Sequence, residues 1–179
     1  MNTPVPAGTW IIDQSHSEVG FTARHLMVSK VRGSFEKFSG TVKVAENFTD
    51  SKVEATIDAS SVNTRDENRD THIRTKDFFA VEEFPTWSFI STGLKAQGSD
   101  YSMDGDLTIK GVTKPITLAL EVLGVNKDPW GNLKAGFAAS TKVNRKDFGI
   151  EWNAPLEAGG VLVGDEVTLN LDIQAALQA

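Results

Sequence analysis

The sequence predicts an all-β protein, and three observations lead to that prediction. Several segments alternate apolar and polar residues, short turn motifs separate them, and only two short segments break the pattern. Alternation with a period of two places one set of side chains inside and the other in water, as in a half-buried antiparallel strand. Sequential hairpins leave exposed sheet edges, which closure into a barrel removes. We therefore expect an antiparallel β-barrel.

Strand character recurs along the whole chain. The clearest alternation is found at residues 53–58, 116–122 and 167–173. Further strands are expected at residues 9–13, 17–23, 40–44, 86–91, 101–109 and 133–143. These segments are rich in β-branched and aromatic residues, which favour strands. The sequence therefore predicts eight or nine strands.

Three connections carry turn residues. Asp128-Pro129-Trp130-Gly131 has proline at the second position and glycine at the closing position, which favours a tight turn. Lys110-Gly111 and Gly98-Ser99-Asp100 each lie between two strand-like segments and indicate hairpins. Short connections of this kind produce a meander of sequential strands.

A polar helix is expected at residues 65–75. Thr64 and Glu67 have the spacing of a capping box, in which each side chain bonds the other residue's free backbone amide. Ile73 is the apolar residue of this segment, so the helix cannot be a core element. We expect it outside the barrel or across one end, anchored by Ile73 and the adjacent Phe78-Phe79.

A second segment, residues 24–31, also breaks the alternation. Its apolar residues are consecutive rather than alternating, with Leu26-Met27-Val28 at the centre. This pattern favours a short helix or an irregular plug over a strand.

Composition bounds the function. The chain has 179 residues, which we interpret as one domain over residues 1–179, and 40% of them are hydrophobic. A formal net charge of −6 argues against a dedicated binder of nucleic acid or of anionic membranes. The apolar runs are too short for a transmembrane helix. Residues 1–6 show no signal-peptide pattern, so a cytoplasmic location is expected.

Residues for catalysis are few. The absence of cysteine excludes disulfides, thiol catalysis, zinc ribbons and iron–sulfur clusters. The spacing of His16, His25 and His72 matches no compact metal-ligand motif, and no serine lies in a nucleophile elbow. Ser15 and Ser17, which flank His16, are interpreted as loop hydroxyls. We therefore expect no metal, no cofactor and no enzymatic activity.

Aromatic residues are plentiful by contrast. Ten Phe and four Trp are distributed over most of the predicted strands and both irregular segments. An eight-stranded barrel is just wide enough to be filled by side chains or to hold one slender ligand. Counting aromatic residues leaves both interpretations open.

Ordered motifs along almost the whole chain resemble the YceI-like, polyisoprenoid-binding family. The resemblance covers about residues 8–173. Its motifs are Trp10…Asp13…His16-Ser17, Gly33-Ser34-Phe35, Ser61-Val62-Asn63-Thr64, Arg69-Asp70…His72-Ile73-Arg74, Asp77-Phe78-Phe79, Gly105-Asp106-Leu107-Thr108-Ile109, Gly111-Val112-Thr113-Lys114-Pro115, Arg145-Lys146-Asp147-Phe148-Gly149 and Val163-Gly164-Asp165-Glu166-Val167.

The resemblance implies a lipocalin-like, eight-stranded antiparallel β-barrel with an elongated apolar cavity. It also implies binding of a long-chain isoprenoid or another lipid-like ligand, such as a quinone, rather than catalysis. Many family members carry a secretion signal and work in the periplasm, and this sequence differs from them at its N-terminus. A homodimer and a monomer are both open.

The ligand-binding candidates combine this resemblance with the alternation. Residues expected to point inward are Val19, Phe21, Ile57, Leu107, Leu118 and Phe137. Residues expected to close the ends are Leu26, Met27, Phe35, Phe38, Phe78 and Trp152. A polar head group could bind His25, Arg24, Arg69 or His72. Each apolar candidate could equally be plain core.

Two functions remain open at this point. The first is binding, storage or transport of a long-chain lipid. The second is an enzyme or antioxidant that acts on such a lipid through His25 or His72 and a nearby carboxylate. The sequence shows no paired nucleophile and base, and this favours the first function.

Overall fold

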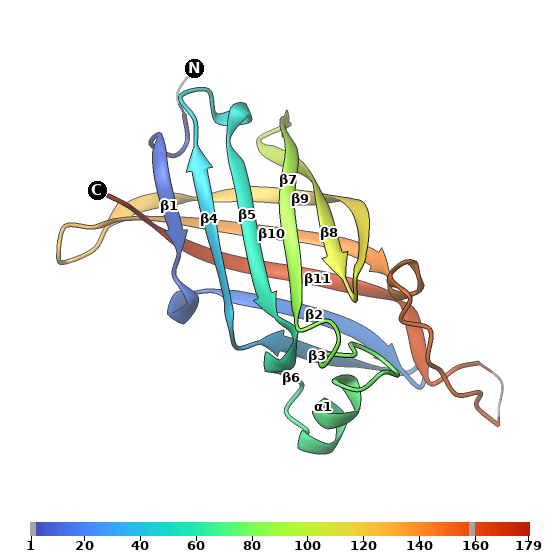
Figure 1. The fold of residues 1–179 in the computed structure, drawn as a ribbon. Helices are drawn as coiled ribbons and strands as arrows, with labels where there is room; N and C mark the ends of the chain where they lie inside the picture. Colours follow the sequence, from blue (N-terminus) through green and yellow to red (C-terminus); the bar gives the residue numbers. More distant parts are fainter. Residues whose placement is uncertain (1–2, 158–159) are drawn as a thin grey trace.

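Eight strands close into an antiparallel barrel in the computed structural model, which describes residues 3–157 and 160–179. Closure depends on β1, which pairs with β4 on one side and with the end of β11 on the other, where Trp10 lies opposite Leu177. In order around the ring the strands are β1 (Gly8–Ile12), β4 (Phe38–Val44), β5 (Lys52–Asp58), β7 (Thr86–Gln97), β8 (Asp100–Ile109), β9 (Val112–Lys127), β10 (Leu133–Asn144) and β11 (Val163–Leu177). The predicted all-β barrel is confirmed (Figure 1).

Three more strands extend the wall beyond this ring: β2 (Glu18–His25), β3 (Ser29–Phe35) and β6 (Val62–Asn63). The long strand β11 joins the two parts, because residues 175–177 pair with β1 while residues 163–172 pair with β2. The helix α1 (Glu67–Ile73) lies below the barrel near β3 and β6 (Figure 1). The interior therefore continues from the ring into a lower part bounded by β2, β3 and α1.

The nine predicted strands all overlap observed ones, but the expectation for residues 24–31 is wrong. These residues form the end of β2, a turn and the start of β3. Leu26 and Met27 turn the chain with positive φ angles of 55° and 61°. The alternation of β3 is hidden because one inward position is Gly33, where a Cβ would collide with the ring of Phe21.

The predicted turns are confirmed. Lys110 and Gly111, both with positive φ, connect β8 to β9. At the β9–β10 turn, the Asp128 carboxylate accepts hydrogen bonds from the backbone amides of Asn132 and Trp130, at 2.8 and 2.9 Å. These bonds, that from Asn132 foremost, lower the pKa of Asp128. They fix the turn by favouring the charged carboxylate.

The helix lies outside the barrel as predicted, but its capping box is wrong. The N-cap is Asp66, whose carboxylate accepts from the amide of Arg69 at 3.0 Å. Thr64 is set apart from the helix by Arg65, whose φ is 66°. Both the amide and the hydroxyl of Thr64 instead donate to the buried Asp70 carboxylate. Hydrogen bonds to Asp70, six residues further along the chain, therefore replace the predicted capping box. No helix in the described part of the chain is long and apolar enough to span a membrane.

Asp70→Ala should lower the free energy of unfolding by about 2–3 kcal/mol, because it leaves two buried donors of Thr64 without an acceptor. Chemical denaturation measures this change. The exposed cap variant Asp66→Ala is the matched control and should cost about 1 kcal/mol. Equal costs for the two variants would contradict a special role for the Thr64–Asp70 contact.

Candidate functional site

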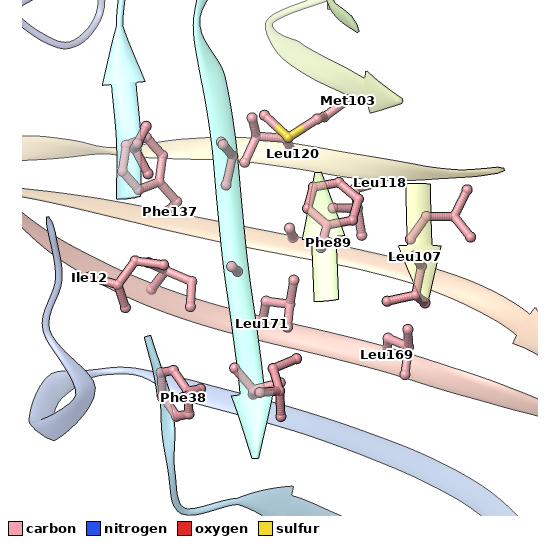
Figure 2. Close-up of a pocket in the computed structure, with 18 of the residues that line it drawn as sticks. Ile12, Phe38, Phe89, Met103, Leu107, Leu118, Leu120, Phe137, Leu169 and Leu171 are labelled. Atoms are coloured by element: carbon pink, nitrogen blue, oxygen red, sulfur yellow. The ribbon is translucent and has the colours of Figure 1, made fainter. Parts of the chain in front are cut away.

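The ring of eight strands encloses an apolar cavity of about 150 Å³, the upper chamber. Figure 2 shows side chains from several strands around it. Among the residues that line it are Ile12, Phe38, Phe89, Met103, Leu118, Leu120, Phe137 and Leu171. Apolar cavities of this size stay dry and accept small apolar groups. The upper chamber is therefore suited to hydrocarbon and not to a polar group.

Strand β7 shows how the sequence builds this wall. Trp87 and Phe89 occupy alternate inward positions, a signal that sequence reasoning could have used. A bulge between Ser91 and Gly93 then shifts the register against β8. One extra residue reverses which side chains point inward, so Leu94 joins the wall. Gly93 is a sign of this bulge in the sequence, but the predicted strand ended at residue 91, and Leu94 was missed for that reason.

A second cavity of about 440 Å³, the lower chamber, lies between β2, β10, β11, α1 and residues 148–152. Its volume falls within the roughly 300–1,000 Å³ that is usual for small-molecule sites. Apolar residues form most of its wall, and polar residues are part of it. The polar members are Arg24, His25, Asp66, Asn68, Arg69, His72 and Arg145. The lower chamber can therefore accept a ligand with both apolar and polar parts.

Four aromatic rings, here called the aromatic partition, lie where the chambers meet: Phe21, Phe35, Phe79 and Trp87. Phe35 has its ring centroid 4.7 Å from that of Trp87 and 5.8 Å from that of Phe21, and Phe79 lies 4.9 Å from Trp87. Trp87 lines both chambers. Its indole nitrogen is buried and has no hydrogen-bond partner among residues 3–157 and 160–179. The partition thus contains a free donor.

The predicted head-group residues all line the lower chamber, but they differ in availability. Arg69 donates from Nε and Nη2 to the hydroxyl and carbonyl of Thr64, at 2.8 and 2.7 Å. His72 Nε2 lies 2.8 Å from Asp77 Oδ2. The side chains of Arg24 and His25 form no hydrogen bond or ion pair within the described part of the chain. Arg24 is exposed and lies on the outer face of the β2–β3 hairpin, so His25 is the group that a ligand in the chamber could engage without breaking a contact.

Arg145 holds the wall of the lower chamber together, and sequence reasoning missed it. Its side chain is 5% exposed and donates to the carbonyls of Ile150, Trp152 and Gly164, each at 2.9 Å. Burial lowers its pKa, which the Asp165 carboxylate at 3.7 Å opposes. Backbone acceptors have no sequence signature, so nothing pointed to this role.

The structure sorts the apolar candidates into three groups. Upper-chamber residues are Val19, Phe35, Phe38, Ile57, Leu107, Leu118 and Phe137. Lower-chamber residues are Phe21, Phe78 and Trp152, together with His25. Leu26 and Met27, expected to close an end, line neither chamber and are 40% and 50% exposed. The left-handed turn carries both residues away from the interior.

The histidines do not form a catalytic relay in this geometry. Asp13 Oδ2 and Ser15 Oγ lie 2.8 and 3.1 Å from the same atom, Nδ1 of His16, whereas a triad uses both ring nitrogens. The pKa of Asp13 is lowered by its bond from Ser15 and then by His16. Ring edges of Phe78 and Trp152 flank His72. Within the described residues, no group of three metal-ligating side chains is found.

A closed eight-stranded antiparallel barrel with an apolar interior is a lipocalin-like fold. The chain belongs to the YceI-like domain family, whose model matches residues 10–175, and the predicted resemblance is confirmed.

Known proteins agree with this assignment. A UPF0312 protein of Photorhabdus laumondii is 43% identical over 141 residues, which cover 78% of this chain and 73% of that protein. The crystal structure of Burkholderia cenocepacia BcnA has a TM-score of 0.77 at 24% identity, covering 91% of this chain and 98% of that chain. A polyisoprenoid-binding domain from Saccharophagus degradans has a TM-score of 0.72 at 14% identity, covering 97% and 100%. The two structures share the fold.

Proposed function

We propose that this protein binds one long-chain isoprenoid or related lipid inside the barrel and stores or transports it. The observation that carries the proposal is the apolar upper chamber and the larger lower chamber next to it, whose walls share Trp87 and Leu169. A prenyl chain needs continuous apolar wall, and each buried methylene contributes about 0.8 kcal/mol. The polyisoprenoid-binding domain of Saccharophagus degradans, which has the same fold, supports this ligand class.

The chambers also suggest how the ligand is oriented. Burying an unpaired polar group in an apolar cavity costs roughly 2–7 kcal/mol, so the upper chamber favours the hydrocarbon tail. A polar head then lies in the lower chamber, where the side chain of His25 has no other partner within the described residues. Binding is favoured over catalysis because the described contacts of His72 are Asp77 and aromatic rings, with no hydroxyl nucleophile.

The free indole N–H of Trp87 supports a quinone-type ligand over a plain hydrocarbon. A buried donor without a partner costs about 1–3 kcal/mol, and an acceptor oxygen on the ligand would remove that cost. Trp87 lines both chambers, so a ligand that spans them passes this donor. A ring carbonyl or hydroxyl at the end of a prenyl chain has the required acceptor.

Organic extraction and mass spectrometry of the purified protein test the proposal directly. We expect a long apolar molecule in the extract, at a level approaching one per protein. A protein without interior cavities, purified from the same cells, serves as the control for carry-over. A clean extract, together with no uptake of a fluorescent polyprenyl probe, would remove the basis for a lipid-binding function.

Trp87→Phe removes the indole N–H donor but keeps an aromatic ring in the wall, so it tests the contribution of the hydrogen bond to ligand affinity. We expect a roughly three- to tenfold weaker affinity for a polyprenyl quinone, the value of one hydrogen bond, and little change for a hydrocarbon such as squalene. Trp130→Phe is the matched control, because Trp130 lies exposed in the β9–β10 turn. An equal loss for both ligands would show that Trp87 acts through packing alone.

A further inference from the structure

Four exposed apolar side chains gather on two neighbouring loops beside the lower chamber. Leu26, Met27 and Val28 form the β2–β3 turn, and Val161 precedes β11; we call these four the apolar tip. The Leu26 amide donates to the Leu162 carbonyl at 2.9 Å and holds the loops together. Val28 is 83% exposed and Val161 37%. Single exposed apolar residues are ordinary, whereas a contiguous group marks an interaction surface.

The surroundings of the apolar tip are basic. Residues 24–32 contain Arg24, Lys30 and Arg32 and no acidic residue, although the whole chain carries a charge of −6. The pairing of β2 with β3 places these three side chains on one face of the hairpin, with Arg24 opposite Lys30. All three are exposed, and none forms an ion pair within the described ranges. The adjoining residues 151–166 contain four acidic residues, of which Asp165 and Glu166 lie 3.4 and 3.6 Å from the ammonium groups of Lys146 and Lys142, so Glu151 and Glu157 remain. The net charge of the whole chain therefore does not reveal the positive charge around the apolar tip.

The apolar tip is also continuous with the lower chamber. His25 and Leu162 line that chamber and directly precede and follow members of the tip along the chain. Figure 1 shows the β2–β3 turn beside the loop that leads into β11, at the end of the molecule away from the chain termini. A surface held by the tip would therefore adjoin the chamber.

We propose that the apolar tip inserts into the interface of an anionic lipid bilayer, with Arg24, Lys30 and Arg32 among the head groups. Exposed apolar residues next to basic ones are the combination that binds such surfaces. A second copy of the chain fits less well, because a two-fold contact through this face brings like charges together. Docking in this way places the lower chamber at the membrane. The proposal therefore says where the protein would take up or release the ligand that we propose it binds inside the barrel.

Co-sedimentation with vesicles that contain no isoprenoid tests the proposal. Phosphatidylcholine vesicles with phosphatidylglycerol should bind the full-length protein more tightly than phosphatidylcholine alone. Met27→Asn combined with Val28→Ser should weaken binding at least about tenfold, since the apolar contribution of both side chains is lost. Asparagine tolerates the positive φ of Met27. Lys30→Gln should weaken binding about fivefold, and only on anionic vesicles.

Leu123→Ser and Lys43→Gln are the matched controls, because both residues are exposed and lie on the ring strands β9 and β4. Both should leave vesicle binding unchanged. Unaltered protein that stays in the supernatant, or an equal loss for Leu123→Ser, would overturn the proposal. So would tip variants that convert a dimer into a monomer in sedimentation velocity without affecting vesicle binding. Lipid extracted from the barrel is an independent readout, so failure here leaves ligand binding intact.

Discussion

Replacing Arg145 with leucine should lower the free energy of unfolding by about 3–5 kcal/mol, among the largest effects of a single substitution in this chain. The change leaves the carbonyls of Ile150, Trp152 and Gly164 without their donor, the first in a buried position and the other two in part-buried positions. Loss of one partner from a buried charged network has this magnitude, because the remaining polar groups stay desolvated. Chemical denaturation followed by tryptophan fluorescence measures it.

The neighbouring Lys146 provides the control. Its ammonium group also lies near Asp165, at 3.4 Å, but this pair is solvent-exposed. Lys146→Leu should therefore change stability by no more than about 1 kcal/mol. Arg145→Leu should in addition weaken polyprenyl binding, because residues 150–152 form part of the lower chamber wall. Similar losses for the two variants would mean that the carbonyl contacts contribute little.

Filling the upper chamber should abolish most ligand binding while leaving the fold intact. Ala139 on β10 lines this chamber, and Ala139→Phe adds a ring to a cavity of about 150 Å³. Excluding about four methylenes of a bound chain costs about 3 kcal/mol, which corresponds to more than a hundredfold in the dissociation constant. Titration with a fluorescent polyprenyl probe measures the affinity, and thermal unfolding measures the stability.

Ala119→Phe is the counterpart on the outer face. Ala119 is exposed and follows the inward-facing Leu118 on β9, so the same ring is added outside the barrel. It should leave the affinity unchanged. A solid core would respond differently: Ala139→Phe would then be overpacked and lose about 1–3 kcal/mol of stability, with no specific effect on binding. That outcome would contradict a hollow barrel.

The strands that could be predicted are those whose inward positions carry large apolar side chains. Strand β3 could not, because its inward series is Val31, Gly33 and Phe35, and the glycine interrupts the pattern. Gly33 has no side chain, and this leaves room for the ring of Phe21 on the neighbouring strand β2. A residue selected for a cross-strand contact cannot be read from its own segment.

The predicted capping box was wrong for a related reason. Thr64 and Glu67 satisfy the local rule for a capping box, yet Thr64 donates to Asp70 and Asp66 caps the helix. Local spacing identified the helix and its external position correctly. The amide of Thr64 could donate to the carboxylate of Glu67 or to that of Asp70. The buried environment determines which of the two it uses, and residue spacing does not reveal that environment.

The inward direction of side chains could be predicted on regular strands but not where the backbone is irregular. Leu118 and Phe137 were predicted by alternation and line the upper chamber. Leu94 follows a bulge, and Met27 lies within a left-handed turn, so each departs from the simple alternation. Alternation predicts direction only while the register is unbroken.

The aromatic partition bears on kinetics as well as on affinity. A chain that reaches both chambers must pass between rings that contact one another, so entry and exit require Phe21, Phe35, Phe79 and Trp87 to rotate or separate. Phe79 lies on the segment that follows α1, where its amide donates to the carbonyl of Ile73 at 2.9 Å. Residence time is then governed by how often this segment loosens, and a ligand can be held for long periods without exceptional affinity.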